Sequence, residues 1–502
     1  MAAEHFDVLI VGAGLSGIGA GVHLREKCPG KTYAILEARA SLGGTWDLFR
    51  YPGIRSDSDM HTLGYDFKPW RDAKSIADGP AILEYVRETA SAYGVDSHIR
   101  YTHQVKAAAW DSASSTWTVT ADRTASGGTA VLTCNFLFMC SGYYSYRGGF
   151  TPDFPGVADY QGRIVHPQKW PEELDYAGRR VVVIGSGATA VTLVPALAET
   201  ADHVTMLQRS PTYVVSRPDR DAIANTLRQV LPEKLAYGLT RWKNVTLQGM
   251  MYRKTRTDPE KVKTLILAGV RQELGPDYDV ETHFTPRYNP WDQRLCLVPN
   301  SDLFAALRSG KASVATDHID TFTKTGIRLK SGEELPADII VTATGLNMAV
   351  MGEAAFSVDG APVDFSKSWT YKGMMFSGVP NLVSTFGYIN ASWTLRADLT
   401  CEYVCRLLTH MDRVGASQAT PRLGDSDAGM PARPWIGDFS AGYMRREMHR
   451  FPRQGDREPW INPQDYKRDK RMIRHGAIAD GAMVFDKAAA GAPAPRRLQA
   501  AE

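Results

Sequence analysis

Residues 12–17 read GAGLSG and follow the largely apolar run FDVLIV of residues 6–11. Such an unbroken, β-branched run is typical of a strand buried on both faces of a parallel sheet. Gly12, Gly14 and Gly17 allow a tight turn and a close approach of the backbone to a pyrophosphate. The N-terminus of the helix that follows can stabilise the phosphate charge. The pattern predicts a dinucleotide-binding βαβ unit.

An acidic residue completes this first unit. The next expected strand, residues 32–36 (TYAIL), ends at Glu37. A carboxylate at this spacing is expected to accept hydrogen bonds from ribose hydroxyls. The alternative is a glycine-rich turn without a ligand. Because strand, glycines, helix and acid all fall in register, we favour nucleotide binding.

A second unit of the same kind begins about 170 residues later. The apolar run of residues 181–184 (VVVI) precedes residues 185–190 (GSGATA), with Gly185, Gly187 and Thr189 at the turn. The next expected strand ends at Arg209 and Ser210 instead of an acid. A guanidinium can bind a 2′-phosphate that a carboxylate would repel, although an exposed strand-end cation is the alternative for this one residue. We therefore predict FAD at the first unit and NADPH at the second, with electron transfer between them.

The composition sets broad limits. The 502 residues are 43% hydrophobic and 23% charged, with a net charge of +3, which suits two or three ordinary globular domains and gives no argument for nucleic acid. Six cysteines show neither a CxxC pair nor zinc spacing, so we predict free buried thiols and no metal. The sequence shows no signal peptide and no apolar run of transmembrane length, and we expect a cytoplasmic protein. The basic stretch 445–474 contains interspersed acids and is interpreted as a solvated face, with a weak attraction to a membrane surface as the alternative.

We predict an α/β fold with two dinucleotide-binding, Rossmann-like domains and a helical insertion in the second. The FAD-binding domain is expected to comprise residues 1–145 and, after a return of the chain, residues 346–487. The NADPH-binding domain is expected over residues 146–345. Its insertion, at about 216–290, is polar and helical in pattern and could cap the site. Residues 488–502, rich in Ala, Pro and Arg, are expected to be disordered.

Two further stretches combine glycine, aromatic and charged residues. Residues 43–57 read GGTWDLFRYPGIRSD, in which Gly44 permits a turn close to a flat cofactor, Trp46 offers an aromatic wall and Asp57 adds a carboxylate. A structural loop with an exposed acid is the alternative. Residues 160–171 read YQGRIVHPQKWP and are expected to form an irregular linker between the domains. His166 has no obvious metal partner there, so we favour a hinge role over direct acid–base catalysis.

These stretches resemble the two fingerprints of the Baeyer–Villiger monooxygenases, a branch of the class B flavoprotein monooxygenases. Residues 43–57 meet the pattern (A/G)GxWxxxx(F/Y)P(G/M)xxxD in full. The pattern FxGxxxHxxxW(P/D) is met from Gly162 through His166 and Trp170 to Pro171, with Tyr160 at its first position in place of Phe. The related N- and S-oxidising flavin monooxygenases share the His but usually lack the Trp.

Residues 50–59 (RYPGIRSDSD) and 288–296 (YNPWDQRLC) are most similar to the ethionamide-activating subgroup. That subgroup is associated with acyclic and aryl-alkyl ketones and with S-oxidation of thioethers or thioamides. The resemblance implies that NADPH reduces FAD, that reduced flavin forms a C4a-peroxyflavin with dioxygen, and that a ketone becomes an ester or lactone. The implied partners are therefore a small ketone or sulfide and oxygen, while the oligomeric state stays open.

By the same resemblance, Arg294 stabilises the developing negative charge and Asp57 is its partner. The alternative for this pair is a structural salt bridge. Many family members carry a Lys immediately before the Arg, whereas this chain has Gln293, so contact with NADPH falls to Arg209. Three other functions stay open: an S- or N-oxygenase acting on thioethers, thioamides or amines, a flavoprotein disulfide reductase or NADPH oxidase, and a non-enzymatic binding module.

Overall fold

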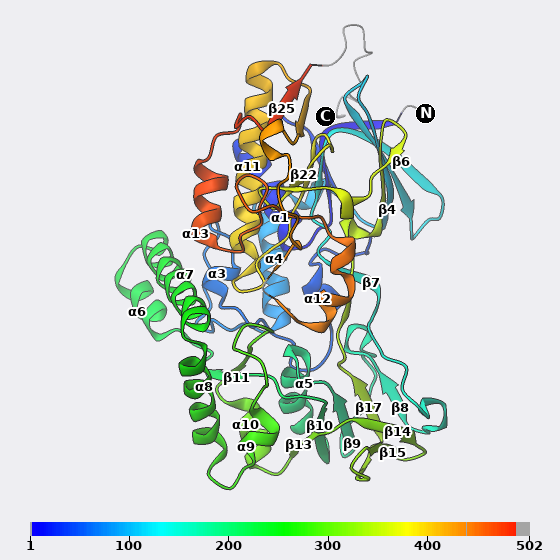
Figure 1. The fold of residues 1–502 in the computed structure, drawn as a ribbon, viewed down its shortest axis with the longest axis vertical. Coiled ribbons are helices and arrows are strands. Elements are labelled where there is room, and N and C mark those ends of the chain that lie inside the picture. The colour runs from blue at the N-terminus through cyan, green and yellow to red at the C-terminus, as the bar shows by residue number, and fades with distance from the viewer. Residues whose placement is uncertain (1–2, 438, 488–502) are drawn as a thin grey trace.

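The computed structural model describes residues 3–437 and 439–487. Figure 1 shows two lobes, the first at the top and the second at the bottom, with a group of helices beside them at the left. The tail predicted to be disordered, residues 488–502, lies outside the described residues. Among the described residues, no helix combines the length and the apolar character needed to cross a membrane.

The first lobe is built on a mixed sheet in which two segments of the chain meet. Its strands are β1 (Glu4–Val11), β2 (Tyr33–Leu36), β3 (Ile99–Arg100), β4 (His103–Asp111), β5 (Thr116–Arg123), β6 (Thr129–Met139), β19 (Ala355–Val358), β20 (Ala361–Pro362) and β23 (Leu382–Ser384). β1 lies between β2 and β6 and runs parallel to both, which buries its apolar side chains on both faces. The late strands β19 and β23 pair with β4 and β6 and so add a second segment of the chain to this sheet.

Helices cover this sheet and bring the C-terminal segment against it. They are α1 (Leu15–Lys27), α2 (Thr45–Leu48), α3 (Met60–Leu63), α4 (Gly79–Ala92) and α11 (Trp393–Val414), and α1 packs on both α4 and α11. Smaller C-terminal elements follow: β21 (Thr370–Tyr371), β22 (Met375–Phe376), β24 (Gln418–Pro421), α12 (Gly442–Glu447), α13 (Tyr466–Asp469) and β25 (Met483–Asp486).

The second lobe contains a parallel sheet in the order β13-β10-β9-β17-β8. These strands are β8 (Arg163–Val165), β9 (Arg180–Ile184), β10 (His203–Gln208), β13 (Ala312–Thr316) and β17 (Ile339–Thr342). Beside the sheet lie α5 (Ala188–Ala198), α10 (Asp302–Arg308) and an antiparallel unit of β14 (Ile319–Thr323), β15 (Gly326–Leu329) and β16 (Glu334–Pro336). The prediction of an irregular linker at 160–171 was wrong for β8, which forms an edge strand of the sheet.

The helices at the left of Figure 1 interrupt the second lobe. They are α6 (Ala222–Val230), α7 (Glu233–Thr257), α8 (Pro259–Leu274) and α9 (Val280–Phe284). The chain leaves the lobe through β11 (Val214–Arg217) and returns through β12 (Cys296–Pro299), and these two strands pair in parallel. The helical segment is thus held at its base by one pair of strands.

The chain passes between the lobes twice. The first passage runs through β7 (Tyr144–Gly149) and the second through β18 (Leu346–Met348), and the two strands pair antiparallel. We call this pair the β7–β18 ribbon. The boundaries predicted at residues 145/146 and 345/346 fall at these two strands.

Candidate functional site

A cavity of about 830 Å³ lies where the two lobes meet. Its lining includes residues of both glycine loops, of the fingerprint loop 43–57 and of the β7–β18 ribbon, together with residues 441–444 and Arg446 of the C-terminal segment. This volume is within the range of about 300–1,000 Å³ that is usual for small-molecule and cofactor sites. The described residues contain no group of three or more His, Cys, Asp or Glu placed to hold a metal ion, and all six cysteines are free and buried.

The first glycine loop is shaped by contacts that exclude side chains. Gly12 has a φ of +103°, and a Cβ there would lie 2.5 Å from the carbonyl oxygen of Cys140. A Cβ on Gly17 would lie 1.8 Å from the carbonyl oxygen of Gly12. Gly14 stands against Gly44, where an added Cβ would lie 3.4 Å from the Gly44 Cα. The loop therefore presents bare backbone to the cavity, as a pyrophosphate requires.

The carboxylate of Glu37 holds the backbone of this loop through a hydrogen bond. One oxygen of its buried carboxylate accepts a 2.7 Å hydrogen bond from the backbone N–H of Ala13, and the other accepts one of 2.9 Å from that of Arg39. Burial raises the pKa of Glu37 above its ordinary value, and the two backbone bonds oppose that rise. Each carboxylate oxygen has a further lone pair, so Glu37 can still accept a hydrogen bond from a ribose hydroxyl.

The fingerprint loop reaches from the first lobe to the second. Trp46 lines the cavity on the first-lobe side. Gly53 lies directly on α5 of the second lobe, where an added Cβ would come within 2.7 Å of the Ala196 Cβ. Burial raises the pKa of Tyr51 to about 12, and a hydrogen bond with Thr189 opposes this rise. The loop predicted to approach a flat cofactor thus also forms part of the contact between the lobes.

The two glycines of the second loop have different surroundings: one is packed against backbone and the other faces open space. Gly185 has a φ of +137°, and a Cβ there would lie 2.4 Å from the carbonyl oxygen of Ala343. A Cβ on Gly187 would meet nothing within 4 Å, so this position faces open space at the N-terminus of α5. Arg209 is exposed and lines the cavity, and its neighbour Ser210 is exposed as well. The Ser186 hydroxyl donates to the Ser210 carbonyl at 3.1 Å, which joins the loop to this strand end.

Arg294 and Asp57 meet across 237 residues of sequence. Nε of Arg294 donates to Oδ2 of Asp57 at 2.9 Å, and Nη2 lies 2.7 Å from the same oxygen. Both side chains line the cavity, with 35% and 28% of their surfaces exposed. The Asp57 carboxylate raises the pKa of Arg294, so the guanidinium stays charged. The pair therefore holds a fixed cation at the cavity wall.

The second fingerprint lies outside the cavity lining. The Nε2 atom of His166 is 3.2 Å from the carbonyl oxygen of Gly345, and Nδ1 accepts a 3.1 Å hydrogen bond from the backbone N–H of Gln168. Both contacts are satisfied by a neutral ring with its proton on Nε2. Trp170 packs edge-on against Tyr176, with 6.3 Å between ring centroids. Gly162 lies so close to Asp338 that a Cβ would come within 2.6 Å of the Asp338 carbonyl oxygen.

The sequence did not predict that Tyr443 and Arg446 of the C-terminal segment form part of the cavity wall. Arg446 was assigned to a solvated face, but it lines the cavity and lies 3.6 Å from the centre of the Phe150 ring. Tyr443 lies beside Arg294, and burial raises its pKa while the guanidinium opposes that rise. Trp393 also lines the cavity and donates to the Ser16 hydroxyl at 2.8 Å. No local motif surrounds Arg446 or Tyr443, so the sequence offered no signal for them.

Two known protein families match parts of the chain. The flavin-binding monooxygenase-like family matches residues 63–257, and the NAD(P)-binding Rossmann-like domain matches residues 10–76. The FAD-containing monooxygenase EthA of Mycobacterium tuberculosis is 56% identical over 485 residues, which cover 96% of this chain and 98% of EthA. The putative FAD-containing monooxygenase MymA of the same species is 50% identical over 97% of this chain and 98% of its own length.

Solved structures agree on the fold. A steroid monooxygenase bound to NADP superposes with a TM-score of 0.77 at 22% identity, over 96% of this chain and all of the other. A cyclohexanone monooxygenase superposes with a TM-score of 0.69 at 21% identity, over 84% of this chain and 90% of the other. The predicted fold class and the predicted resemblance are thereby confirmed. The similarity to EthA along almost its whole length shows that this chain belongs to the flavin-binding monooxygenase-like family.

Proposed function

We propose that the protein uses NADPH and dioxygen to convert ketones, acyclic or aryl-alkyl, into esters or lactones. Oxidation of thioethers to sulfoxides is the expected side activity. One observation carries the proposal: the Arg294–Asp57 pair faces the same cavity as both glycine loops. A fixed cation between two nucleotide sites is what a reaction with an oxygen-centred anion requires.

The residues of the two loops fit the two nucleotides. Gly14 and Gly44 offer bare backbone to the FAD pyrophosphate, and Glu37 is placed to accept from its ribose. The open position at Gly187 and the N-terminus of α5 suit the NADPH pyrophosphate, and Arg209 with Ser210 suits the 2′-phosphate. When bound, FAD supplies the chemistry of oxygen activation and transfer, and NADPH supplies the hydride.

The role of the protein in the oxygenation step is electrostatic. Arg294 donates hydrogen bonds to the oxygen-centred anion and to the oxyanion that forms on the substrate carbonyl. Asp57 fixes the plane of the guanidinium by binding Nε and Nη2. Aromatic side chains exclude water from this part of the cavity. Phe386 and Trp393 line it beside Tyr143, and their ring centroids lie 5.4 and 5.3 Å from that of Tyr143.

Replacing Arg294 tests this role. In Arg294→Ala, NADPH should still bleach the flavin absorbance, but ester formation should fall by about 10²–10³, because a donor to the developing charge is lost. Stopped-flow absorbance and product analysis by gas chromatography measure the two steps separately. Arg287→Ala is the matched control, since Arg287 is exposed and stands in the same segment. A normal ester yield from Arg294→Ala would remove Arg294 from the proposal.

Oxidation of sulfur or nitrogen is a second candidate, and Trp170 is the reason to keep it. This fingerprint residue separates the ketone-oxidising pattern from the N- and S-oxidising one, yet it packs against Tyr176 outside the cavity lining. It does not select a substrate by direct contact. A methyl ketone and a thioether should therefore be compared side by side with limiting NADPH. Sulfoxide without ester from any ketone favours the second candidate, and stoichiometric hydrogen peroxide with neither product indicates an oxidase.

A further inference from the structure

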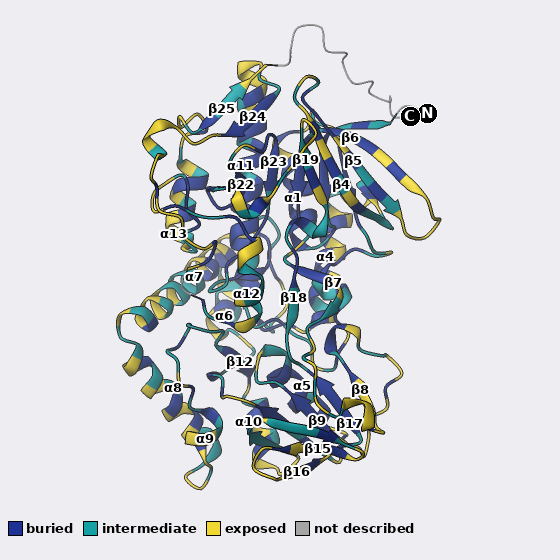
Figure 2. Ribbon diagram, turned by 45° about the vertical axis from the view of Figure 1, so that its right-hand side comes forward, coloured by how far each residue is buried: buried dark blue, intermediate teal, exposed yellow. Residues whose placement is uncertain are grey.

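Apolar side chains are concentrated on the outside of one group of helices. We call α6, α7 and α8 the helical arm. Nine of the fifteen large hydrophobic residues that are exposed in the described chain lie on it: Ile223, Val230, Leu235, Leu239, Trp242, Leu247, Met250, Met251 and Leu265. Figure 2 shows exposed residues along these helices where they stand away from the two lobes. Scattered exposed apolar residues are ordinary, but a concentration of this kind marks an interaction surface.

The stripe on α7 has the periodicity of one helix face. Leu235, Leu239, Trp242 and Met250 follow one another at intervals of four, three and eight residues, which places them on one side of the helix. Trp242 is 69% exposed, more than any other large aromatic side chain described. The opposite side is buried and contains Ala236, Tyr237, Thr240 and Arg241. α7 therefore carries apolar side chains on two faces. One face is buried in the protein, and the face with Leu235, Leu239, Trp242 and Met250 is exposed.

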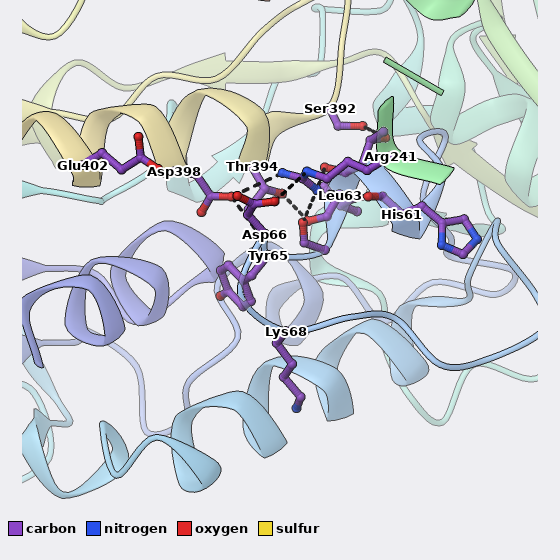
Figure 3. A network of polar contacts seen from close by, with 12 residues as sticks. His61, Leu63, Tyr65, Asp66, Lys68, Arg241, Ser392, Thr394, Asp398 and Glu402 are labelled. Atoms are coloured by element: carbon purple, nitrogen blue, oxygen red, sulfur yellow. Dashed lines mark hydrogen bonds and ion pairs between the residues drawn. The ribbon is translucent and has the colours of Figure 1, made fainter. Parts of the chain in front are cut away.

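The covered face is fixed to the first lobe. Arg241 is 7% exposed, and its Nη1 donates to the carbonyl oxygens of His61 and Gly64 at 3.0 and 2.9 Å. Its Nη2 donates to Asp398 on α11 at 3.3 Å, and Asp66 lies 3.5 Å from Nε (Figure 3). A buried guanidinium with this many partners resists rotation of the helix, because any turn would leave the charge unpaired. The exposed stripe cannot turn inward.

The charge of the arm is unlike that of the rest of the chain. Residues 222–274, from the start of α6 to the end of α8, contain ten Lys and Arg against four Asp and Glu, a net charge of +6, while the whole chain carries +3. The remaining residues are therefore net negative. Lys234, Arg253, Lys254 and Lys261 are exposed among the apolar residues. The surface combines an apolar stripe with a basic surround.

The apolar stripe and the surrounding cations distinguish two possible partners for the helical arm, a second copy of this chain and a membrane surface. In a twofold dimer the same patch meets itself, so a second copy would bring the exposed cations Lys234, Arg253, Lys254 and Lys261 of the two chains together. A bilayer with anionic headgroups attracts the cations and accepts the apolar side chains at the boundary of its acyl chains. We propose that the helical arm docks the protein on the surface of an anionic membrane, without spanning it. The proposal concerns a surface outside the cavity, so its failure leaves the proposed reaction untouched.

Vesicle sedimentation of the full-length, FAD-loaded protein tests the proposal. We expect the protein to sediment with vesicles of phosphatidylglycerol and phosphatidylcholine much more than with phosphatidylcholine alone. Binding should weaken between 0.1 and 1 M salt, because the screening length falls from about 10 Å to about 3 Å. Equal sedimentation with both vesicle types, or with neither, would overturn the proposal.

Two sets of variants identify the surface. Changing Leu239, Trp242 and Met250 together to Gln should lower the partition coefficient at least about tenfold, because the inserted apolar area is lost. Changing Arg253, Lys254 and Lys261 to Glu should do the same by reversing the charge. The control changes Val131, Val157 and Leu423 to Gln, since these exposed apolar residues lie away from the arm.

Flavin absorbance and NADPH consumption confirm that each variant is folded. Retention of vesicle binding by both the apolar and the charge-reversal variant would contradict the proposal. Sedimentation equilibrium tests the alternative, in which a second copy of this chain binds the helical arm. A wild-type dimer that the apolar changes dissociate, with no binding to either vesicle, would assign the surface to a second copy instead.

Discussion

At the scale of single residues, Arg209 is a predicted contact to NADPH that has an exposed side chain. It follows directly after β10, and its exposed side chain lines the cavity. By the family resemblance a Lys is expected before Arg294, and this chain has Gln293 there, which also lines the cavity but has no charge. We therefore expect recognition of a 2′-phosphate to depend mainly on Arg209.

Removal of that cation should change cofactor preference more than activity. In Arg209→Ala, the ratio of kcat/KM for NADPH to that for NADH should fall by about 10- to 100-fold, since a charge-assisted contact to phosphate is lost. Initial rates of NADPH and NADH oxidation give the ratio. Arg179→Ala is the control, because Arg179 is exposed in the same lobe outside the cavity lining. An unchanged ratio would show that another group reads the phosphate.

His166 predicts a dependence of stability on pH. Burial lowers its pKa below the ordinary value of about 6.5, so between the two values the unfolded chain binds the proton that the folded protein does not. The contribution of this site to the unfolding free energy is complete above about pH 6.5 and is lost as pH falls toward the lowered pKa. His166→Asn should therefore lose less stability than the wild type between pH 7.5 and pH 5.5 in thermal melts.

Other histidines share this behaviour, so the comparison must be between variants. Burial also lowers the pKa of His61, His98 and His283. His318→Asn serves as the control because His318 lies on an exposed turn of the second lobe. If His166→Asn and the wild type lose stability equally on acidification, burial does not hold the ring of His166 neutral in the folded protein.

At the scale of elements, the sequence predicts what is encoded locally. The runs at β1 and β9, with glycines directly after them, define both nucleotide units because a parallel strand, its turn and its helix are adjacent in the chain. β8 was missed because it is three residues long and two of them are exposed, which leaves no apolar run to detect. Arg446 was missed because its partner Phe150 is almost 300 residues away in the sequence. The contact of Arg294 with Asp57 came only from the family resemblance, since no local pattern links residues 237 positions apart.

The two glycines of the second loop predict opposite failures. Gly185→Ala should prevent stable folding of the second lobe, because the added Cβ would collide with the Ala343 carbonyl at a positive φ. Gly187→Ala should fold and keep its FAD, but its KM for NADPH should rise at least about tenfold, because the methyl group enters the space left for the pyrophosphate. Thermal melts, flavin content and NADPH kinetics distinguish these cases. Gly269→Ala in α8 is the control, since its Cβ also meets nothing within 4 Å; a normal KM for Gly187→Ala would place the nucleotide elsewhere.

At the scale of the whole molecule, the cavity depends on how the lobes are joined. The fingerprint loop touches both, through Trp46 on one side and Gly53 on the other. Arg55, from the same loop, forms an ion pair with Asp302 on α10 of the second lobe. The helical arm is fixed to the first lobe by Arg241 although its chain belongs to the second. The site is thus assembled by contacts that cross between the lobes, which is why sequence patterns found its parts but not its full wall.

The pairing of β7 with β18 has a consequence for how this protein can diverge. Because the two passages pair with each other, a motion of one lobe relative to the other must deform both strands together. A residue added to or removed from one strand changes its length by about 3.3 Å, and the irregular pairing between Leu346 and Met348 would have to absorb that difference. We therefore expect a change in the length of this segment to alter the distance between the two glycine loops more than a substitution in it does.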